Sequence, residues 1–378
     1  MTTLVAAADA EHRVVHRDPF AYCAHPHAVA LADGDWLMVF NRAPRRPFVL
    51  HPPEEPEFRN VMVRSSDRGA TWSAPVVAPG YEWHGVECAG LSALACGRVL
   101  LHQWRFRWYP LPTARRRAAA GDLVFPRDLV TALVASPEHE ADPALRRRAE
   151  ALMPWARGND GTYVHLSDDA GATWPLTVRI DTAPFSGGYG MRGAIELPDG
   201  GLLLPLCDVP HYERVFVVRS GDRGESWAAP VAAASEPGKA FEEPCALLLP
   251  SGRILILLRE NRSRRLHQVV SDDGGRSWSH PEPTPIDGYP PHLLLLADGR
   301  ILCTYGYRRP DYGIRAVMSA DGGMSWDVGQ TLRIRGGLPN RDLGYPCTLT
   351  CSDGRFVTIY YGQGADGITS IQSTSFGI

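Results

Sequence analysis

The sequence lacks the features that would place this protein in a membrane or on a nucleic acid. No apolar run approaches the ~20 residues that a membrane-spanning helix requires. The 39 lysines and arginines are outnumbered by 42 aspartates and glutamates, and the formal net charge of −3 disfavours binding to nucleic acid or to an anionic membrane. The first residues carry no basic segment, unlike a signal peptide. We therefore expect a cytoplasmic protein with neither a membrane nor a nucleic-acid partner.

The cysteines also lack the spacings that mark metal or redox sites. There are eight of them, and none forms a Cys-x-x-Cys pair. Most lie inside apolar runs, where a free cysteine behaves as a small buried apolar residue in a reducing compartment. We predict no disulfide framework, no metal site and no cofactor.

What the sequence does contain is a repeated eight-residue motif. The pattern Ser-x-Asp-x-Gly-x-x-Trp occurs five times, beginning at Ser65, Ser167, Ser220, Ser271 and Ser319. The glycine supplies the positive φ of a tight turn, and the serine and aspartate side chains can accept hydrogen bonds from its amides. The tryptophan can bury a large apolar face between neighbouring sheets. We predict that each copy stabilises a turn and has no catalytic role.

A second repeat indicates the number of sheets. A turn of the type Asp-Gly or Ser-Gly joins two apolar strands at six glycines: Gly34, Gly97, Gly200, Gly252, Gly299 and Gly354. Repeats of this length predict an all-β six-bladed β-propeller, formed by residues 1–378 as a single domain. No motif copy follows the last turn. We therefore expect a strand near His12 to His16 to complete the sixth blade and close the ring, which removes exposed sheet edges.

The first two motif copies are 102 residues apart, whereas the later ones are 53, 51 and 48 apart. About fifty extra residues, roughly 107–159, therefore form an insertion in the second blade. The stretch from Asp142 to Leu152 predicts a short helix, because a proline lies near its start and apolar residues share one face. The insertion joins the second and third strands of its blade, so we expect it on the face opposite the glycine turns, as a possible lid.

That opposite face is where the innermost strands begin and where a ligand is expected. Six equivalent positions, nine residues before each turn glycine, hold His25, Cys88, Met191, Glu243, Pro290 and Tyr345. Neighbouring positions and the ends of the second strands add the candidate binding residues Arg42, His27, Arg192, Arg259, Arg308 and His292. Packing alone does not account for so many polar side chains in one ring, and the ring predicts a binding site.

The motif copies resemble the Asp-box of the sialidase (neuraminidase) superfamily, and this resemblance covers almost the whole chain. Sialidases also carry a glutamate at the start of one inner strand and an arginine at the end of the next, matched here by Glu243 and Arg259. A tyrosine that begins a later inner strand is matched by Tyr345. The resemblance implies that Tyr345 is the nucleophile, Glu243 its base and Arg259 a ligand of the substrate carboxylate. A neutral phenol avoids the repulsion that an anionic nucleophile would meet at a carboxylate-bearing anomeric carbon.

The sequence departs from the family in two places. Sialidases begin the first blade with Arg-Ile-Pro, but Ala24-His25-Pro26 stands here, so one arginine of the carboxylate clamp is missing. The third clamp arginine has no clear counterpart, although Arg308, Arg309 and Arg315 lie in the right blade. The family's acid lies in the loop before the first box. Here Glu54, Glu55 and Glu57 are the candidates. We include Glu55 and His25 among the predicted catalytic residues.

Three functions remain open from the sequence, all with a carbohydrate as the partner. The first is a glycoside hydrolase with a sialidase-like mechanism on an acidic sugar. The second is a propeller polysaccharide lyase or non-sialic glycosidase, in which His25, His27 or His292 moves a proton and arginines neutralise a uronate. The third is a non-catalytic glycan-binding propeller.

Overall fold

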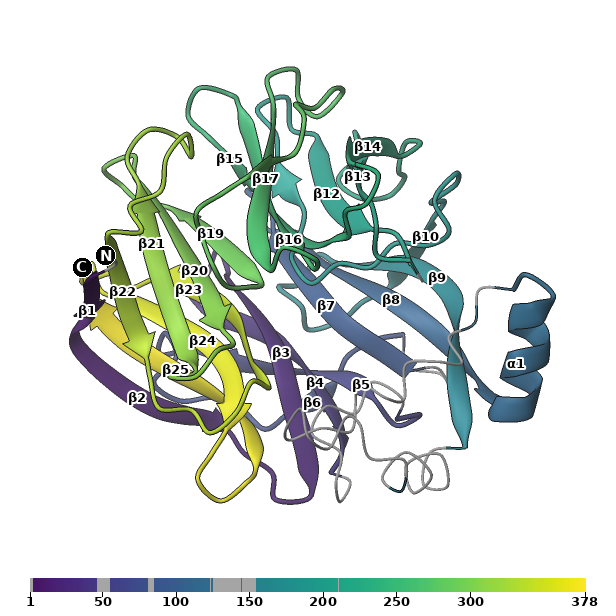
Figure 1. The fold of residues 1–378 in the computed structure, drawn as a ribbon, viewed down its shortest axis with the longest axis horizontal. Helices are drawn as coiled ribbons and strands as arrows, with labels where there is room; N and C mark the ends of the chain where they lie inside the picture. Colours follow the sequence, from purple (N-terminus) through teal and green to yellow (C-terminus); the bar gives the residue numbers. More distant parts are fainter. Residues whose placement is uncertain are drawn as a thin grey trace.

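The computed structural model describes residues 3–45, 55–80, 85–122, 124, 144, 154–209 and 211–378, apart from the side chain of Glu87. These residues form six sheets arranged around one axis, antiparallel except for one parallel strand pair in blade five (Figure 1). The predicted six-bladed all-β propeller is confirmed. In every blade the first strand lies innermost, because the Gly turn reverses the chain into the second strand and successive strands move outward.

The first three blades take up residues 21–234. Blade one contains β3 (Ala21–Ala30), β4 (Trp36–Pro44), β5 (Arg59–Ser65) and β6 (Val76–Val77). Blade two contains β7 (Gly85–Ala93), β8 (Val99–Pro110), β9 (Trp155–Ser167) and β10 (Leu176–Ile180). Blade three contains β11 (Ile195–Glu196), β12 (Leu202–Cys207), β13 (Val215–Ser220) and β14 (Val231–Ala234).

The last three blades take up residues 241–377 together with the N-terminal strands. Blade four contains β15 (Phe241–Leu248), β16 (Ile254–Glu260), β17 (Arg265–Ser271) and β18 (Glu282–Pro283). Blade five contains β19 (Pro291–Leu295), β20 (Ile301–Tyr307), β21 (Gly313–Ser319) and β22 (Gln330–Arg335). Blade six contains β23 (Leu343–Thr350), β24 (Phe356–Gln363) and β25 (Thr369–Gly377).

The N-terminal segment closes the ring in two steps. Strand β2 (Ala8–His16) pairs antiparallel with β25 and completes blade six, which confirms the strand expected near His12 to His16. Strand β1 (Thr3–Ala6), which no repeat in the sequence indicates, pairs parallel with β22 and adds a fifth strand to blade five. The purple N-terminal strands and the yellow C-terminal blade therefore lie side by side in Figure 1.

The repeated motif stabilises its turn as its side chains predict. In the copy that starts at Ser220, the serine hydroxyl accepts a hydrogen bond from the amide of Gly224 at 2.8 Å, and an oxygen of Asp222 accepts one from the amide of Ser226 at 2.9 Å. Equivalent bonds occur in the other four copies. Gly224 has a φ of 94°, and the Trp227 indole packs against the apolar core between blades two and three.

The insertion in blade two begins later than residue 107 and ends earlier than residue 159. Strands β8 and β9 continue as a hairpin extension in which Pro110 pairs with Trp155, and helix α1 (Leu111–Ala119) follows at once. In Figure 1 this helix lies at the periphery of the molecule. The helix predicted at 142–152 falls almost wholly outside the described residues. No helix in the described part of the chain is both long and apolar enough to cross a membrane.

Candidate functional site

Four inner strands carry the same backbone irregularity at equivalent positions. His25, Cys88, Glu243 and Tyr345 have φ values of 54°, 41°, 54° and 50°, and the strand register shifts at each of them. Such β-bulges re-aim a side chain, and left-handed backbone at non-glycine residues is typical of functional sites. In three of the four strands the next residue is proline, which bulges tolerate because they free it from donating a ladder hydrogen bond.

The bulges in blades four and six bring Tyr345 and Glu243 together. The Tyr345 hydroxyl donates a hydrogen bond to Oε1 of Glu243. Both side chains are buried, with residue exposures of 6% and 3%. Burial, and then the negative charge of Glu243, raises the pKa of Tyr345 well above its usual value, so the phenol keeps its proton at rest. A buried carboxylate that accepts a phenolic proton is the arrangement in which a base can assist a tyrosine nucleophile.

Arg259, at the end of β16, is held by two carboxylates. Its Nη1 donates to Oε2 of Glu243 at 3.1 Å, and its Nε lies 3.2 Å from Oε1 of Glu242. Asn261 donates a further hydrogen bond to Glu242 at 2.6 Å. The guanidinium also stacks on the ring of Tyr289, 4.1 Å from its centre. These contacts fix Arg259 beside the Tyr345–Glu243 pair and compensate its charge.

Arg308, which directly follows β20, is held differently. Its Nε donates to the Leu343 carbonyl oxygen at 3.0 Å, and its guanidinium lies 5.4 Å from the ring centre of Tyr289 and 5.7 Å from that of Tyr345. Its Nη2 is buried without a hydrogen-bond partner, and no carboxylate of the described residues pairs with it. Arg308 therefore presents an uncompensated positive charge beside the nucleophile candidate, which favours an anionic ligand group.

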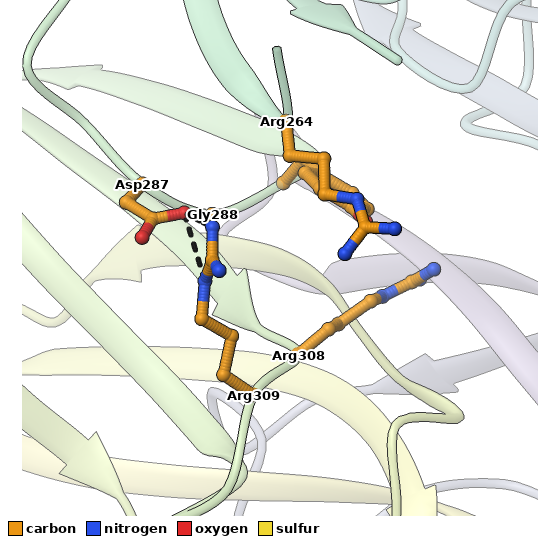
Figure 2. Close-up of a pocket in the computed structure, with 6 residues that line it drawn as sticks. Arg264, Asp287, Gly288, Arg308 and Arg309 are labelled. Carbon is orange, nitrogen blue, oxygen red and sulfur yellow. Dashed lines mark hydrogen bonds and ion pairs between the residues drawn. The ribbon is translucent and has the colours of Figure 1, made fainter. Parts of the chain in front are cut away.

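A pocket opens beside Arg308, and three of its six lining residues are arginines. It is lined by Arg264, Asp287, Gly288, Tyr289, Arg308 and Arg309. Figure 2 shows Arg264 and Arg308 extending from different blades into the same space, whereas Arg309 turns to Asp287. Nη2 of Arg309 lies 2.6 Å from Oδ1 of Asp287, so the charges of these two residues compensate each other. Two arginines thus remain to attract an acidic ligand.

His25 lies under Tyr345 in an aromatic enclosure. Its ring centre is 4.3 Å from that of Tyr345, 5.0 Å from that of Tyr361 and 6.5 Å from that of Phe58. Tyr361 is itself fixed by a 2.9 Å hydrogen bond from its hydroxyl to Asp342. Aromatic rings therefore surround the residue that follows Ala24, and Ala24 stands where the resemblance requires the first clamp arginine.

Two other predicted site residues belong to blade one. Glu55 is 1% exposed, and its Oε1 accepts a hydrogen bond from the amide of Glu57 at 3.3 Å. It lies three residues before Phe58, which packs on His25. Arg42 is more exposed, and its Nη2 pairs with Asp18 at 2.6 Å. Glu54 lies outside the described residues.

His27, His292 and Arg192 do not join the Tyr345 cluster. His27 accepts a hydrogen bond from the Leu91 amide, and His292 contacts Thr348 and Cys347. Arg192 donates to the carbonyl oxygens of Pro291 and Pro346. The structure groups these three predicted residues with one another, in a separate buried cluster between the inner strands.

One ring nitrogen from each of His27 and His292 and the sulfur of Cys347 lie within 4.8 Å of one another, a spacing that could hold a metal ion. The chemistry of the donors disfavours this use. Each histidine Nδ1 accepts a hydrogen bond from a backbone amide, at 3.0 Å for His27 and 3.3 Å for His292, so the proton of the neutral ring is on Nε2. The Cys347 thiol donates to the Ala28 carbonyl oxygen at 3.3 Å, and burial raises its pKa. The neighbouring guanidinium of Arg192 would also repel a cation.

Several residues of this site were given no role from the sequence. Glu242 and Tyr289 hold Arg259, and Arg264 lines the pocket with Arg308. Glu242 directly precedes the predicted base, and the adjacent pair of glutamates was the available signal. Cys88 occupies the fourth bulge, where its sulfur lies 3.2 Å from the Tyr189 hydroxyl.

Comparison with known families agrees with this architecture. The family model described as BNR repeat-like domain matches residues 150–359, more than half of the 378 residues. The chain belongs to the BNR repeat-like domain family. A search of the curated proteins found no match to this BNR-repeat protein.

Solved structures share the fold of the BNR-repeat protein at low identity. A protein of unknown function from Dyadobacter fermentans is 22% identical, with a TM-score of 0.80 over 97% of this chain and 98% of its own. The intramolecular trans-sialidase from Ruminococcus gnavus is 16% identical, with a TM-score of 0.65 over 100% and 99%. An α-L-arabinanase from Penicillium chrysogenum is 15% identical, with a TM-score of 0.61 over 96% and 97%. The names of these two enzymes refer to different sugars, so the shared fold does not identify a substrate.

Proposed function

We propose that this protein is a glycoside hydrolase that acts on an acidic sugar with a sialidase-like mechanism. The observation that carries the proposal is the buried hydrogen bond between Tyr345 and Glu243, flanked by the uncompensated Arg308. The substrate carboxylate would lie against Arg308 and Arg264, which line the pocket. The anomeric carbon would then lie next to the Tyr345 hydroxyl.

The reaction would follow two displacements. In the first, the Tyr345 oxygen attacks the anomeric carbon, its proton passes to Glu243, and the glycosidic bond breaks. A carboxylic acid protonates the departing oxygen, and Glu55 is our candidate for that role. In the second, the Glu55 carboxylate takes a proton from water as the water oxygen attacks the anomeric carbon, the bond to the Tyr345 oxygen breaks, and the phenol recovers its proton from Glu243. Two inversions retain the configuration at the anomeric carbon.

A neutral sugar is the second candidate substrate, and one feature favours it. Glu242 and Glu243 together compensate Arg259, and Ala24 stands where the resemblance requires an arginine. The carboxylate clamp is therefore weaker than three free arginines would make it. The similarity to the arabinanase fold is compatible with this alternative.

The decisive experiment is a panel of aryl glycosides assayed at equal concentration. It should include an α-sialoside, a β-glucuronide and an α-L-arabinofuranoside. We expect turnover of the acidic glycosides and an inverse dependence of kcat/KM on ionic strength, because screening weakens the attraction to Arg308 and Arg264. Release of the aryl group from the arabinofuranoside alone would replace our proposal with the neutral-sugar candidate. An unsaturated product from a uronic-acid polymer would indicate a lyase, and binding without turnover would indicate a lectin.

A further inference from the structure

The cluster that contains Arg192 holds a buried charge that the proposed reaction does not use. Arg192 is 3% exposed. Its Nε and Nη2 donate to the carbonyl oxygen of Pro291 at 3.2 and 3.0 Å, and its Nη2 donates to that of Pro346 at 2.8 Å. Its Nη1 is buried with no hydrogen-bond partner, and no carboxylate in the described part of the chain pairs with it. An isolated buried guanidinium is costly unless an anion compensates it.

The side chains around Arg192 are also hydrogen-bond donors. The two carbonyl oxygens that hold Arg192 belong to the residues before His292 and Cys347, so the guanidinium lies next to both. The Nδ1 atoms of His27 and His292 accept backbone hydrogen bonds, so the Nε2–H group is the donor of each ring; that of His292 lies 3.6 Å from the Cys347 sulfur, a weak acceptor that an anion can replace. Burial, and then the Arg192 charge, lowers the pKa of both histidines well below 6.5, so both rings are neutral.

Three classes of ligand differ in how they would meet this cluster. A metal cation would meet the Arg192 charge and two protonated ring nitrogens. A water molecule could accept from Nη1 but would leave the charge uncompensated. A small monovalent anion satisfies the unpaired Nη1 donor and the charge together, and because one ring nitrogen of each histidine and the Cys347 sulfur lie within 4.8 Å of one another, only a compact ion suits this spacing.

We propose that Arg192, His27 and His292 form a binding site for a small monovalent anion such as chloride, distinct from the Tyr345 site. His27 lies on β3 of blade one, His292 on β19 of blade five, and Arg192 on the segment before β11 of blade three. The anion therefore joins three non-adjacent blades near the axis. Its binding energy adds to the stability of the folded ring by mass action.

The test uses the whole purified protein at constant ionic strength and pH. We expect the Tm to rise when sodium gluconate is replaced by sodium chloride or bromide, by about 2 °C for each tenfold increase above the dissociation constant. Crystals soaked in bromide should show an anomalous peak between Nη1 of Arg192 and the rings of His27 and His292.

Two variants separate the site from a general salt effect. Arg192→Gln should abolish the difference between chloride and gluconate. Arg157→Gln is the matched control, because Arg157 is also buried, at 4% exposure, but stacks on Trp104 and Phe106 at 5.1 and 5.2 Å. That variant should retain the chloride dependence whatever its baseline Tm.

Equal Tm values in the two salts together with no bromide peak would overturn the proposal and leave water as the partner of Arg192. Stoichiometric zinc bound at His27 and His292 would overturn it in favour of a metal site. If Arg192→Gln does not fold, the bromide peak in the wild-type crystal still decides the question.

Discussion

Replacing Tyr345 by phenylalanine tests the proposed chemistry most directly, because it removes a single oxygen. The ring keeps its packing against His25 and Tyr361, with centres 4.3 and 5.8 Å away. Glu243 loses the phenolic donor but keeps Arg259 at 3.1 Å, so its charge stays paired. A hydrogen bond to a charged group contributes about 1.5–3 kcal/mol. We expect the free energy of unfolding to fall by an amount near the lower end of this range, because Arg259 still pairs with Glu243.

The effect on catalysis should be far larger. General-base assistance alone accounts for ~10²–10⁴-fold in rate, and the variant loses the nucleophile as well. We therefore expect kcat on the best aryl glycoside to fall by at least about 10³-fold. Affinity for the product sugar, measured by isothermal titration calorimetry, should change little, because Arg308 and Arg264 are untouched.

Tyr360→Phe provides the matched control. Tyr360 is fully buried on the same strand, β24, that carries Tyr361, and its hydroxyl bonds Thr374 at 2.9 Å rather than a site residue. It should lose about 1 kcal/mol of stability and keep its turnover. Near wild-type kcat in Tyr345→Phe, with the Tm of both variants measured by calorimetry, would refute the tyrosine mechanism and leave His25 as the next candidate.

Other expected outcomes concern specificity, stability and the insertion. Glu242→Gln should free part of the charge of Arg259 and tighten binding of a carboxylate-bearing inhibitor several-fold, by roughly 1 kcal/mol; titration calorimetry that shows weaker binding would contradict this. Trp227→Ala should cost about 3 kcal/mol in thermal unfolding without changing ligand affinity in the folded fraction. Burial lowers the pKa of His165 to about 4 from 6.5, so the unfolded chain binds more protons between these values and stability should fall as the pH drops from 6.5 to 4; His165→Gln should make the Tm less dependent on pH in that window. Replacing residues 111–154 by a short Gly-Ser linker should alter KM while changing the Tm little; a large loss of Tm with unchanged KM would remove the lid interpretation.

The fold could be predicted from the sequence because each blade repeats its own turn chemistry. The six turn glycines and the five boxes impose positive φ angles and side-chain hydrogen bonds locally, without help from distant residues. The pairing of β1 with β22 was not predictable in this way. Strand β1 has four residues and no repeat partner, and its place depends on the free edge of blade five.

The site was predictable only where the repeat register applies. Counting back from the turn glycines located Tyr345 and Glu243. Equivalent positions lie at the same depth on the face where the inner strands begin, so these two side chains can meet. The same count could not show that His25 and Arg308 join the Tyr345 cluster whereas His27 and Arg192 join the other one. The bulge shifts the register by one residue, so side chains two positions apart enter different clusters. The partners of each arginine also depend on contacts between blades, which no local pattern records.

The four bulges are equivalent backbone positions around the axis of the propeller. Each holds its residue in left-handed backbone at the start of an inner strand, yet the four occupants are a histidine, a cysteine, a glutamate and a tyrosine. The backbone thus fixes where a functional group is presented, and the side chain alone decides which group it is. Exchanging the residues at these four bulge positions would change the chemistry of the site while the surrounding sheets stay unchanged. β-branched residues are the ones such a redesign should avoid, because they tolerate positive φ poorly.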